Sequence, residues 1–310
     1  MRNTYHSSVM AGEIESYMRS MERPSVFIDA TLGEGGHSLH ILNAFPHIFC
    51  IGIDADEHIL ERAKQRLEGF ANRIEFHNMW FDDFFCDQKS IKNVSGILFD
   101  LGISTFHYGA RERGFSFDSD DAIDMRISQK QERSAEDILY ETSEQELADI
   151  FYYFGEESRA RKIARSIYKE LIEPGVTPIT CERLAYTVKG CFPKERRYKF
   201  PHPATRVFQA LRIAVNSELD RLKRVLHSAL LSLEHLGLLM VISFHSLEDR
   251  IVKNFFKSYD VQKSIGTDSE EKPLLRIVTK KVQRATLEEV EKNPSSRSAK
   301  LRVAQRIVHA

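Results

Sequence analysis

The sequence predicts an α/β protein in which a doubly wound, seven-stranded sheet is interrupted by an all-helical insertion. Two observations support this fold class. Short β-rich runs alternate with helical patterns over the first hundred residues, which is typical of a parallel sheet with crossover helices. The β-rich runs then stop between residues 117 and 205 and resume afterwards, so the intervening stretch is predicted to be an inserted helical domain.

The predicted strands are short runs rich in β-branched and aromatic residues. They fall at residues 26–29, 48–54, 73–77, 96–101, 238–244, 274–279 and 300–305. Helices are predicted at 38–44, directly after a glycine-rich turn, and at 58–67, where apolar residues recur at helical spacing. The run at 238–244 is nearly all apolar, so that strand is expected to be buried on both faces.

Inside the insertion, helix starts are marked by capping boxes, in which a hydroxyl and a carboxylate three residues apart satisfy free N–H groups. Ser134 with Asp137 and Ser143 with Glu146 fit this pattern. Further helices are predicted at 156–171 and 182–190, and a long helix after residue 205 is expected to break near residues 216–217. The predicted domains are a cofactor-binding domain at 1–112 and 204–310 and a helical substrate-recognition domain at 113–203.

Composition narrows the class of protein. A chain of 310 residues with 42% hydrophobic content can bury a substantial core. Its apolar runs are too short to span a bilayer, so we expect a soluble, cytoplasmic protein that does not bind membranes. The four cysteines lie far apart, which predicts neither a zinc site nor a disulfide framework. Because the net charge is -1, any binding of nucleic acid must come from local basic patches.

The glycine turn at 29–37 lies where a strand meets a helix, and ligands of open α/β sheets bind at such junctions. Gly33, Gly35 and Gly36 allow a tight turn and close approach of a ligand, although a turn without a ligand is equally compatible with them. Asp54 ends the next strand, at the offset where a carboxylate accepts from ribose hydroxyls. Ser38 breaks the dinucleotide fingerprint, so S-adenosylmethionine is favoured over NAD.

Two further strand ends carry polar residues. Asp100 ends the fourth strand and could bind the amino group of the cofactor, accept from an incoming amine, or simply cap a loop. The segment 243–249 ends the fifth strand with His245, Glu248 and Asp249. One histidine is thin support for a metal site, so no metal is expected. A substrate-facing loop, or simply a capped helix starting near Ser246, is favoured over a metal site.

Basic residues gather at 194–206, where Tyr198, Phe200 and His202 are interleaved, and again between residues 280 and 306. Arg and Lys neutralise phosphates while exposed rings stack on unpaired bases, so these groups favour a nucleic-acid partner. Charged surface faces are common in proteins, so this pattern alone favours a nucleic-acid partner only slightly.

Several longer motifs carry a family resemblance. They stand at 33–38 (GEGGHS), 100–104 (DLGIS), 113–117 (RGFSF), 124–126 (DMR), 202–206 (HPATR) and 243–250 (SFHSLEDR). With further similarity at 208–213, 216–219 and 293–302, the chain resembles the RsmH family, also called MraW, over nearly its whole length.

The resemblance implies a class I methyltransferase domain with an inserted helical domain. It implies S-adenosylmethionine-dependent methylation of the exocyclic N4 of a cytidine in the decoding region of 16S rRNA, cytidine 1402, within the small ribosomal subunit. A homodimer is one option for the oligomeric state. Two rival functions stay open at this point: an RNA-binding assembly factor without transferase activity, and an N-methyltransferase acting on DNA or protein.

The expected site residues follow from the motifs and the strand ends. Cofactor contacts are expected from Gly33, Gly35, Gly36, His37, Asp54, Trp80 with Phe81 as the alternative, Asp100, and His107, which stands where the family usually has glutamine. Asp100 and His245 are the candidate catalytic residues. RNA contacts are expected from Arg113, Arg126, Arg197, His202, Arg206 and Arg297.

Overall fold

The computed structural model describes residues 7–87, 91, 93–104, 113–198, 201–261 and 274–308. The chain forms two compact units, each treated separately below. The sheet unit comprises Met1–Ile103 and Leu219–Ala310, and the helical unit comprises Ser104–Glu218. Within the described residues, no helix is both long and apolar enough to cross a membrane.

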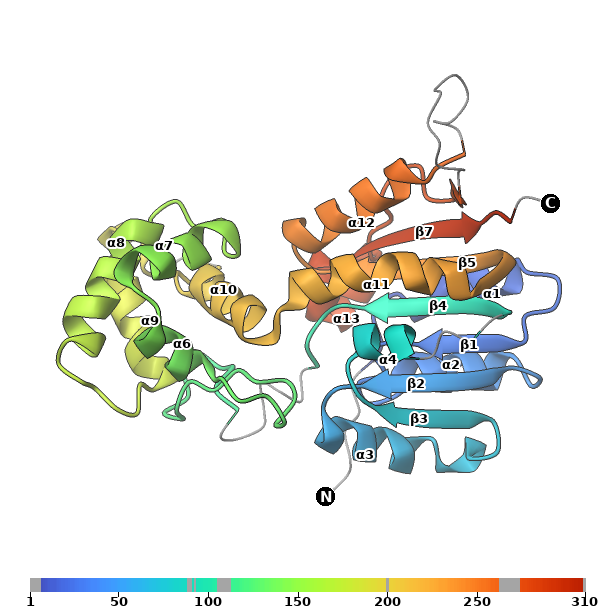
Figure 1. The fold of residues 1–310 in the computed structure, drawn as a ribbon, viewed down its shortest axis with the longest axis horizontal. Helices are drawn as coiled ribbons and strands as arrows, with labels where there is room; N and C mark the ends of the chain where they lie inside the picture. The colour runs from blue at the N-terminus through green and yellow to red at the C-terminus, as the bar shows by residue number, and fades with distance from the viewer. Residues whose placement is uncertain are drawn as a thin grey trace. The chain divides into compact units, whose positions relative to one another are not determined.

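The sheet unit contains a seven-stranded sheet in the order β3-β2-β1-β4-β5-β7-β6 (Figure 1). The first five strands are parallel, whereas β7 runs antiparallel to both β5 and β6. The strands are β1 Val26–Asp29, β2 Phe49–Asp54, β3 Ile74–Asn78, β4 Val94–Asp100, β5 Leu233–Ser243, β6 Leu275–Ile277 and β7 Lys300–Arg306. The predicted fold class of a seven-stranded Rossmann-like sheet is confirmed.

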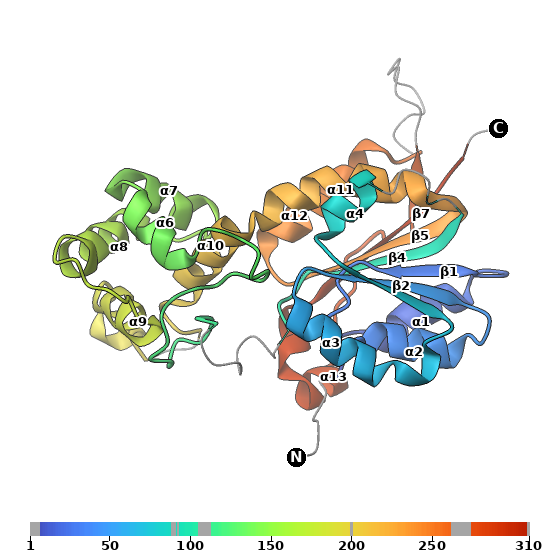
Figure 2. The same cartoon turned by 60° about the horizontal axis from the view of Figure 1, so that its bottom comes forward.

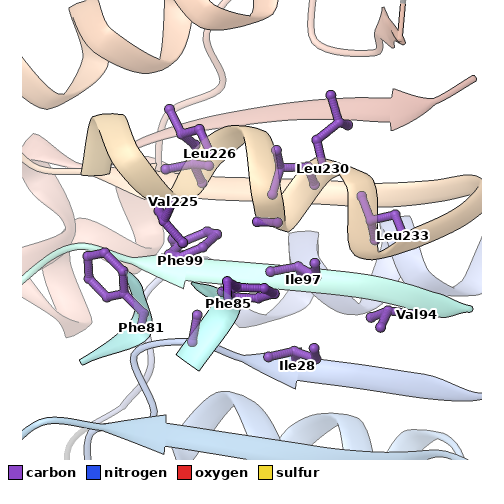
Figure 3. Close-up of a cluster of buried hydrophobic side chains, with 14 of the residues drawn as sticks. Ile28, Phe81, Phe85, Val94, Ile97, Phe99, Val225, Leu226, Leu230 and Leu233 are labelled. Atoms are coloured by element: carbon purple, nitrogen blue, oxygen red, sulfur yellow. The ribbon is translucent and has the colours of Figure 1, made fainter. Parts of the chain in front are cut away.

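Both faces of the sheet are covered by helices, as a mostly parallel sheet requires (Figure 2). Residues from α1 (Ala11–Arg19), α2 (Gly36–Ala44) and α3 (Glu57–Arg66) form the core on one face. The other face is covered by α4 (Phe81–Asp87), α11 (Glu218–Ser232) and α12 (Ser246–Ser258). Figure 3 shows part of this second core, where Phe85 of α4 and Leu226 of α11 lie over Ile97 and Phe99 of β4.

The remaining elements of the sheet unit are short: α13 (Leu287–Lys292) and the 3₁₀ turns at Glu68–Phe70 and Pro294–Ser298. The sequence patterns did not predict α1, α4 or α13, and each of these has ten residues or fewer. A helix of that length depends on tertiary packing for its stability, so its own sequence carries a weak signal.

The helical unit consists of α6 (Ala135–Glu141), α7 (Glu144–Tyr153), α8 (Ala160–Ile167), α9 (Cys181–Gly190) and α10 (Thr205–Asn216), with a π-helical turn at Tyr168–Ile172 and a 3₁₀ turn at Lys194–Arg196. Both predicted capping boxes are present, at the starts of α6 and α7. The helix predicted at 156–171 begins later, because Glu156 takes a left-handed conformation with φ of 48°. Its last turn is wound as a π-helix.

The observed limits of the helical unit differ from the predicted 113–203, because α10 packs on α6 and α7. Asn216, at the end of α10, is fully buried. Its amide nitrogen donates to the Met125 and Arg212 carbonyls at 2.8 and 2.9 Å, and its oxygen accepts from the Ile127 N–H at 2.9 Å. The predicted break at residues 216–217 is confirmed, since Ser217 has a left-handed φ of 51° between α10 and α11.

Replacing Asn216 by Ala should destabilise the helical unit by roughly 2 to 4 kcal/mol, because it leaves the part-buried Ile127 N–H and the buried Met125 carbonyl without these partners. Urea unfolding followed by circular dichroism measures this loss. Asn254→Ala, an exposed position on α12, is the matched control and should change stability by less than about 0.5 kcal/mol. Equal stability of the two variants would contradict the anchoring role of Asn216.

Candidate active site at the carboxyl edge of the sheet

Parallel pairing brings the carboxyl ends of five strands to one edge of the sheet, and each strand ends on a polar residue. These residues are Asp29, Asp54, Asn78, Asp100 and Ser243. The winding of the chain reverses between β1 and β4, which lie side by side although they are separated in sequence by β2 and β3. This switch point is where open α/β sheets bind their ligands.

The glycine turn joins β1 to α2 and is constrained by its neighbours. Gly35 has a positive φ of 76°, and a Cβ there would lie 2.7 Å from Leu67 Cδ1. A Cβ on Gly36 would lie 2.0 Å from Ser8 Oγ. Gly33 also has a positive φ, of 53°, but a Cβ there would meet no described atom within 4 Å. Gly35 is therefore favoured by its positive φ and its close packing, and a Cβ on Gly36 would displace the Ser8 hydroxyl, whereas the space beside Gly33 is open to a ligand.

Asp54 ties this turn to the end of β2. Its Oδ2 accepts from the Gly33 N–H at 2.8 Å, and its Oδ1 accepts from the Asp56 N–H at the same distance. Asp56 in turn caps α3 by accepting from the His58 N–H. A carboxylate can accept about four hydrogen bonds, so these contacts are compatible with hydroxyl donors from a ligand. Asp54 is partly exposed, as such a role requires.

A buried polar cluster lies between the ends of β1 and β4. Asp29 is fully buried, and its Oδ2 accepts from Ser38 Oγ at 2.8 Å. His37 is buried with its Nε2 3.4 Å from Asp100 Oδ2, and the Asp100 N–H donates to Thr31 Oγ1 at 2.7 Å. The serine that breaks the dinucleotide fingerprint thus has a local purpose, because it holds the carboxylate of Asp29.

Burial and charge act together on this cluster. Desolvation raises the pKa of Asp29, although His37 and the Ser38 hydroxyl work against the shift. Burial opposes protonation of His37, but Asp100 and Asp29 outweigh it, so the pKa of His37 is raised. Both shifts favour retention of a proton by the cluster.

Four buried atoms of the cluster have no hydrogen-bond partner among the described residues: Asp29 Oδ1, Asp100 Oδ1 and both ring nitrogens of His37. An unsatisfied buried polar group costs about 1 to 3 kcal/mol. Native proteins therefore leave few such groups, and a cluster of them indicates a place for a polar or charged ligand group. The two carboxylates make a cationic group the better match.

Trp80 follows β3 at the same edge and is partly exposed. The guanidinium of Arg221 lies 4.2 Å from the centre of its ring, a cation–π contact. Arg221 is itself paired with the buried Asp82, with Nη1 2.7 Å from Oδ1. Phe81, the alternative adenine neighbour, is buried and packs edge-on against Phe99 at 5.4 Å. Trp80 is therefore better placed than Phe81 to contact a ligand.

The end of β5 is shaped by a helix cap. His245 is the N-cap of α12, with Nδ1 accepting from the Glu248 N–H at 3.5 Å, and the Glu248 carboxylate accepts from the Phe244 N–H at 2.8 Å. Asp249 pairs with Arg302 at 2.7 Å. The predicted capped helix is confirmed. The ring of His245 is also held by Glu248, with Nε2 3.0 Å from Oε1. A catalytic role for His245 stays a prediction.

Two of the arginines expected to bind RNA make hydrogen bonds within the helical unit. Arg113 is buried and donates to the carbonyls of Arg126 and Ile127 at 3.0 and 2.9 Å. As a buried group it cannot reach RNA in this conformation, so that expectation is corrected. Arg126 is held by Asp124, with Nη2 2.7 Å from Oδ2, and donates to the Gln131 carbonyl.

The other predicted RNA contacts lie nearer the surface. Arg197 donates to the carbonyls of Phe192 and Gly190, and the exposed Arg206 donates to the Glu156 carbonyl at 2.8 Å. The ring of His202 stacks on Phe117 at 4.9 Å, and Arg297 is exposed in the sheet unit. His107 lies outside the described residues.

The sequence patterns missed Asp29, Thr31 and Arg221 as contributors to the site. Asp29 carried a usable signal, since it is a charged residue at the end of a buried strand. Arg221 carried none, because it is 141 positions from Trp80 and only the packing of α11 brings the two together.

Comparisons with known proteins agree on one family. The model of the MraW methylase family matches residues 3–307. Ribosomal RNA small subunit methyltransferase H of Treponema denticola is 43% identical over 311 residues, covering 97% of this chain and 97% of its own length. The proteins of that name from Prochlorococcus marinus strain NATL1A and Sulfurihydrogenibium are 44% and 43% identical, covering 97% of this chain and 95% and 99% of their own.

A solved rRNA methylase from Streptococcus thermophilus aligns over 98% of this chain and all of its own, with 10% identity and a TM-score of 0.39, a similarity too weak to carry an argument. The sequence matches extend from end to end, across both the sheet unit and the helical unit. The chain belongs to the MraW methylase family.

Proposed function

We propose that this protein transfers a methyl group from S-adenosylmethionine to the exocyclic N4 of a cytidine in 16S rRNA, cytidine 1402 of the decoding region, within the small ribosomal subunit. Family membership and the names of the relatives support a methylase that acts on small-subunit ribosomal RNA. The observation that carries the proposal is a pair of carboxylates at the switch point of the sheet, the buried Asp29 and the partly buried Asp100. Each has one buried oxygen without a hydrogen-bond partner among the described residues.

The residues of the edge fit S-adenosylmethionine. This cofactor carries a positive sulfonium and a positive ammonium group, which match the carboxylates of the buried Asp29 and the partly buried Asp100. Asp54 would accept from the ribose hydroxyls, and the open backbone at Gly33 would let the ligand approach the turn. Trp80 would cover a face of the adenine.

The bound cofactor supplies an electrophilic methyl group on a sulfonium. The amine of cytosine is a poor nucleophile, because its lone pair is delocalised into the ring, so the protein must mainly align the nitrogen with the methyl carbon. Asp100 would accept a hydrogen bond from the amine, which orients the nitrogen and stabilises the positive charge that develops on it. Asp100 or water would then take the proton that the methylated nitrogen releases.

The cysteines support an amine as the methyl acceptor rather than ring carbon C5, which needs a cysteine nucleophile. None of the four cysteines follows a proline, the usual setting of such a nucleophile. Cys50 of β2 is buried, and burial raises the pKa of its thiol, which is the opposite of activation. Cys181 and Cys191 belong to the helical unit and are also buried.

The deciding experiment follows tritium from labelled S-adenosylmethionine into small ribosomal subunits, naked 16S rRNA, DNA and protein. We expect label in small-subunit RNA that digestion identifies as N4-methylcytidine. Label in DNA or protein alone would instead identify an enzyme with another substrate. Cofactor binding without any transfer would identify an assembly factor.

Asp54→Asn should weaken binding of S-adenosylmethionine roughly 10- to 150-fold, because a charge-assisted hydrogen bond to a ribose hydroxyl is lost. Calorimetric titration measures the Kd. Asp220→Asn, a 71% exposed carboxylate on α11, is the matched control and should bind like the unmodified protein. An unchanged Kd for Asp54→Asn would remove Asp54 from the ribose site.

Trp80 is the sole tryptophan, so its fluorescence reports directly on the predicted adenine contact. Titration with S-adenosylmethionine should change its emission with the Kd found by calorimetry, and Trp80→Ala should weaken binding roughly 5- to 150-fold. Trp80→Phe keeps a ring and should retain most of the affinity. Normal calorimetric binding without any change in emission would favour a different contact.

Asp100→Ala should lower the single-turnover rate of methyl transfer at least about 100-fold at saturating cofactor, because the acceptor for the amine is lost. If Asp100 only binds the ammonium of the cofactor, raising the cofactor concentration should restore the rate. Asp100→Asn, which keeps one acceptor oxygen, should retain more activity than the alanine variant. Full activity of Asp100→Ala with normal cofactor affinity would contradict both roles.

A further inference from the structure

The charges of the helical unit are segregated along the chain. Residues 134–157, which include α6 and α7, contain eight Asp and Glu and no Lys or Arg. Residues 159–198, which include α8 and α9, contain ten Lys and Arg against four Glu. Because the whole chain has a net charge of -1, this basic stretch is a local feature of one part of one unit.

Packing gathers several of these cations around the end of α9, which contacts α8 (Figure 2). From α8, Lys162 Nζ donates to the Cys191 carbonyl at 3.0 Å. Arg159, just before α8, lies over the Phe192 ring at 5.4 Å. From beyond α9, Arg197 donates to the carbonyls of Phe192 and Gly190. The negative end of a helix dipole attracts cations, which accounts for their presence at this helix end.

Helix capping does not account for two tyrosines beside these cations. Tyr186 of α9 is 75% exposed, and Tyr198, which follows the 3₁₀ turn, is 84% exposed. Lys189 Nζ lies 4.0 Å from the centre of the Tyr198 ring, so an aromatic face and an ammonium group are presented together. Tyr186 and Lys189 are three residues apart on α9 and therefore lie on the same side of the helix.

We propose that this surface, the tyrosine platform formed by Tyr186, Lys189 and Tyr198 with the adjoining cations Arg159, Lys162 and Arg197, binds unpaired nucleotides of the substrate RNA. The inference rests on the proposed function, since it takes RNA as the substrate. Tyrosine rings stack on the faces of unpaired bases, while Lys and Arg neutralise the phosphates between them. The stretch at 134–157 has the opposite charge and repels the same backbone.

The chemistry selects single-stranded RNA over duplex. In a duplex the base faces are already stacked, so an exposed ring finds partners only in loops, bulges and melted segments. A target base whose amine must reach the methyl donor also has to leave its stack. A platform for neighbouring unpaired nucleotides would hold the strand while the target base is withdrawn.

The test measures binding of a fluorescein-labelled single-stranded 16S rRNA fragment from the decoding region to the full-length protein. Tyr186→Leu and Tyr198→Leu should each weaken binding roughly 5- to 150-fold, because base–aromatic stacking contributes about 1 to 3 kcal/mol per base. Tyr186→Phe and Tyr198→Phe keep the ring and should bind like the unmodified protein. The Kd for S-adenosylmethionine should not change in any of these variants.

The chain offers matched controls in the same unit. Tyr152 and Tyr153 of α7 are 58% and 64% exposed but lie within the acidic stretch. Tyr152→Leu and Tyr153→Leu should leave RNA affinity unchanged. Lys189→Gln and Arg197→Gln should each reduce the slope of log K against log salt by about 0.7, the value for one phosphate contact on a single strand.

Two results would overturn the proposal. In the first, both Tyr186→Leu and Tyr198→Leu bind the RNA with the same Kd as the unmodified protein. In the second, the control variants of α7 lose as much RNA affinity as these two variants. Failure of the proposed function would be detected separately, because the unmodified protein would then transfer no label to small-subunit RNA. If that protein transfers label normally and Tyr186→Leu has the same KM for RNA, only the platform is excluded.

Discussion

The parallel pairing of β1 with β4 is the constraint on which the site depends. It places Asp29 and Asp100, 71 positions apart in sequence, at one edge of the sheet, where His37 Nε2 lies 3.4 Å from Asp100 Oδ2. The strands that end there hold Asp29 fully buried and Asp100 partly buried. The hydroxyls of Ser38 and Thr31 then fix the Asp29 side chain and the Asp100 backbone respectively, so the site is preorganised by its neighbours.

The helical unit is inserted into the chain shortly after β4, whose last residue is Asp100. The chain leaves β4 at Asp100 and enters the helical unit at Ser104. It returns through α10 and Ser217 to α11, which carries Arg221 against Trp80. Asp100, shortly before the insertion, and Arg221, shortly after it, therefore both belong to the proposed site in the sheet unit.

The strands, the glycine turn and the capping boxes could be predicted because each is encoded locally. Apolar runs define the buried strands, and the Ser134 and Ser143 caps need only residues three positions away. The membership of α10 in the helical unit could not be predicted, since it rests on Asn216 bonding to residues about 90 positions earlier. Composition, periodicity and motifs contain no information about such a pairing.

The same distinction applies to the site and to the arginines. Gly33 and Asp54 were predictable from their places after strands, and they are hydrogen-bonded to each other. Arg113 lies in a motif and carries a charge, which suggests a surface role, but its side chain is buried and its guanidinium donates to the Arg126 and Ile127 carbonyls. A charged side chain can bind a ligand or hydrogen-bond to the backbone of its own chain. The sequence does not distinguish these two roles, whereas the burial of the side chain in the structure does.

The electrostatics of the cluster connect its burial to the chemistry of its ligand. Burial raises the pKa of Asp29, and the neighbouring carboxylates raise that of His37, so without a ligand the cluster tends to keep a proton. A cation placed between Asp29 and Asp100 stabilises both ionised carboxylates and lowers their proton affinity. The same cation disfavours the imidazolium form of His37. Under the proposed function, binding of the positively charged cofactor at this cluster would favour release of that proton.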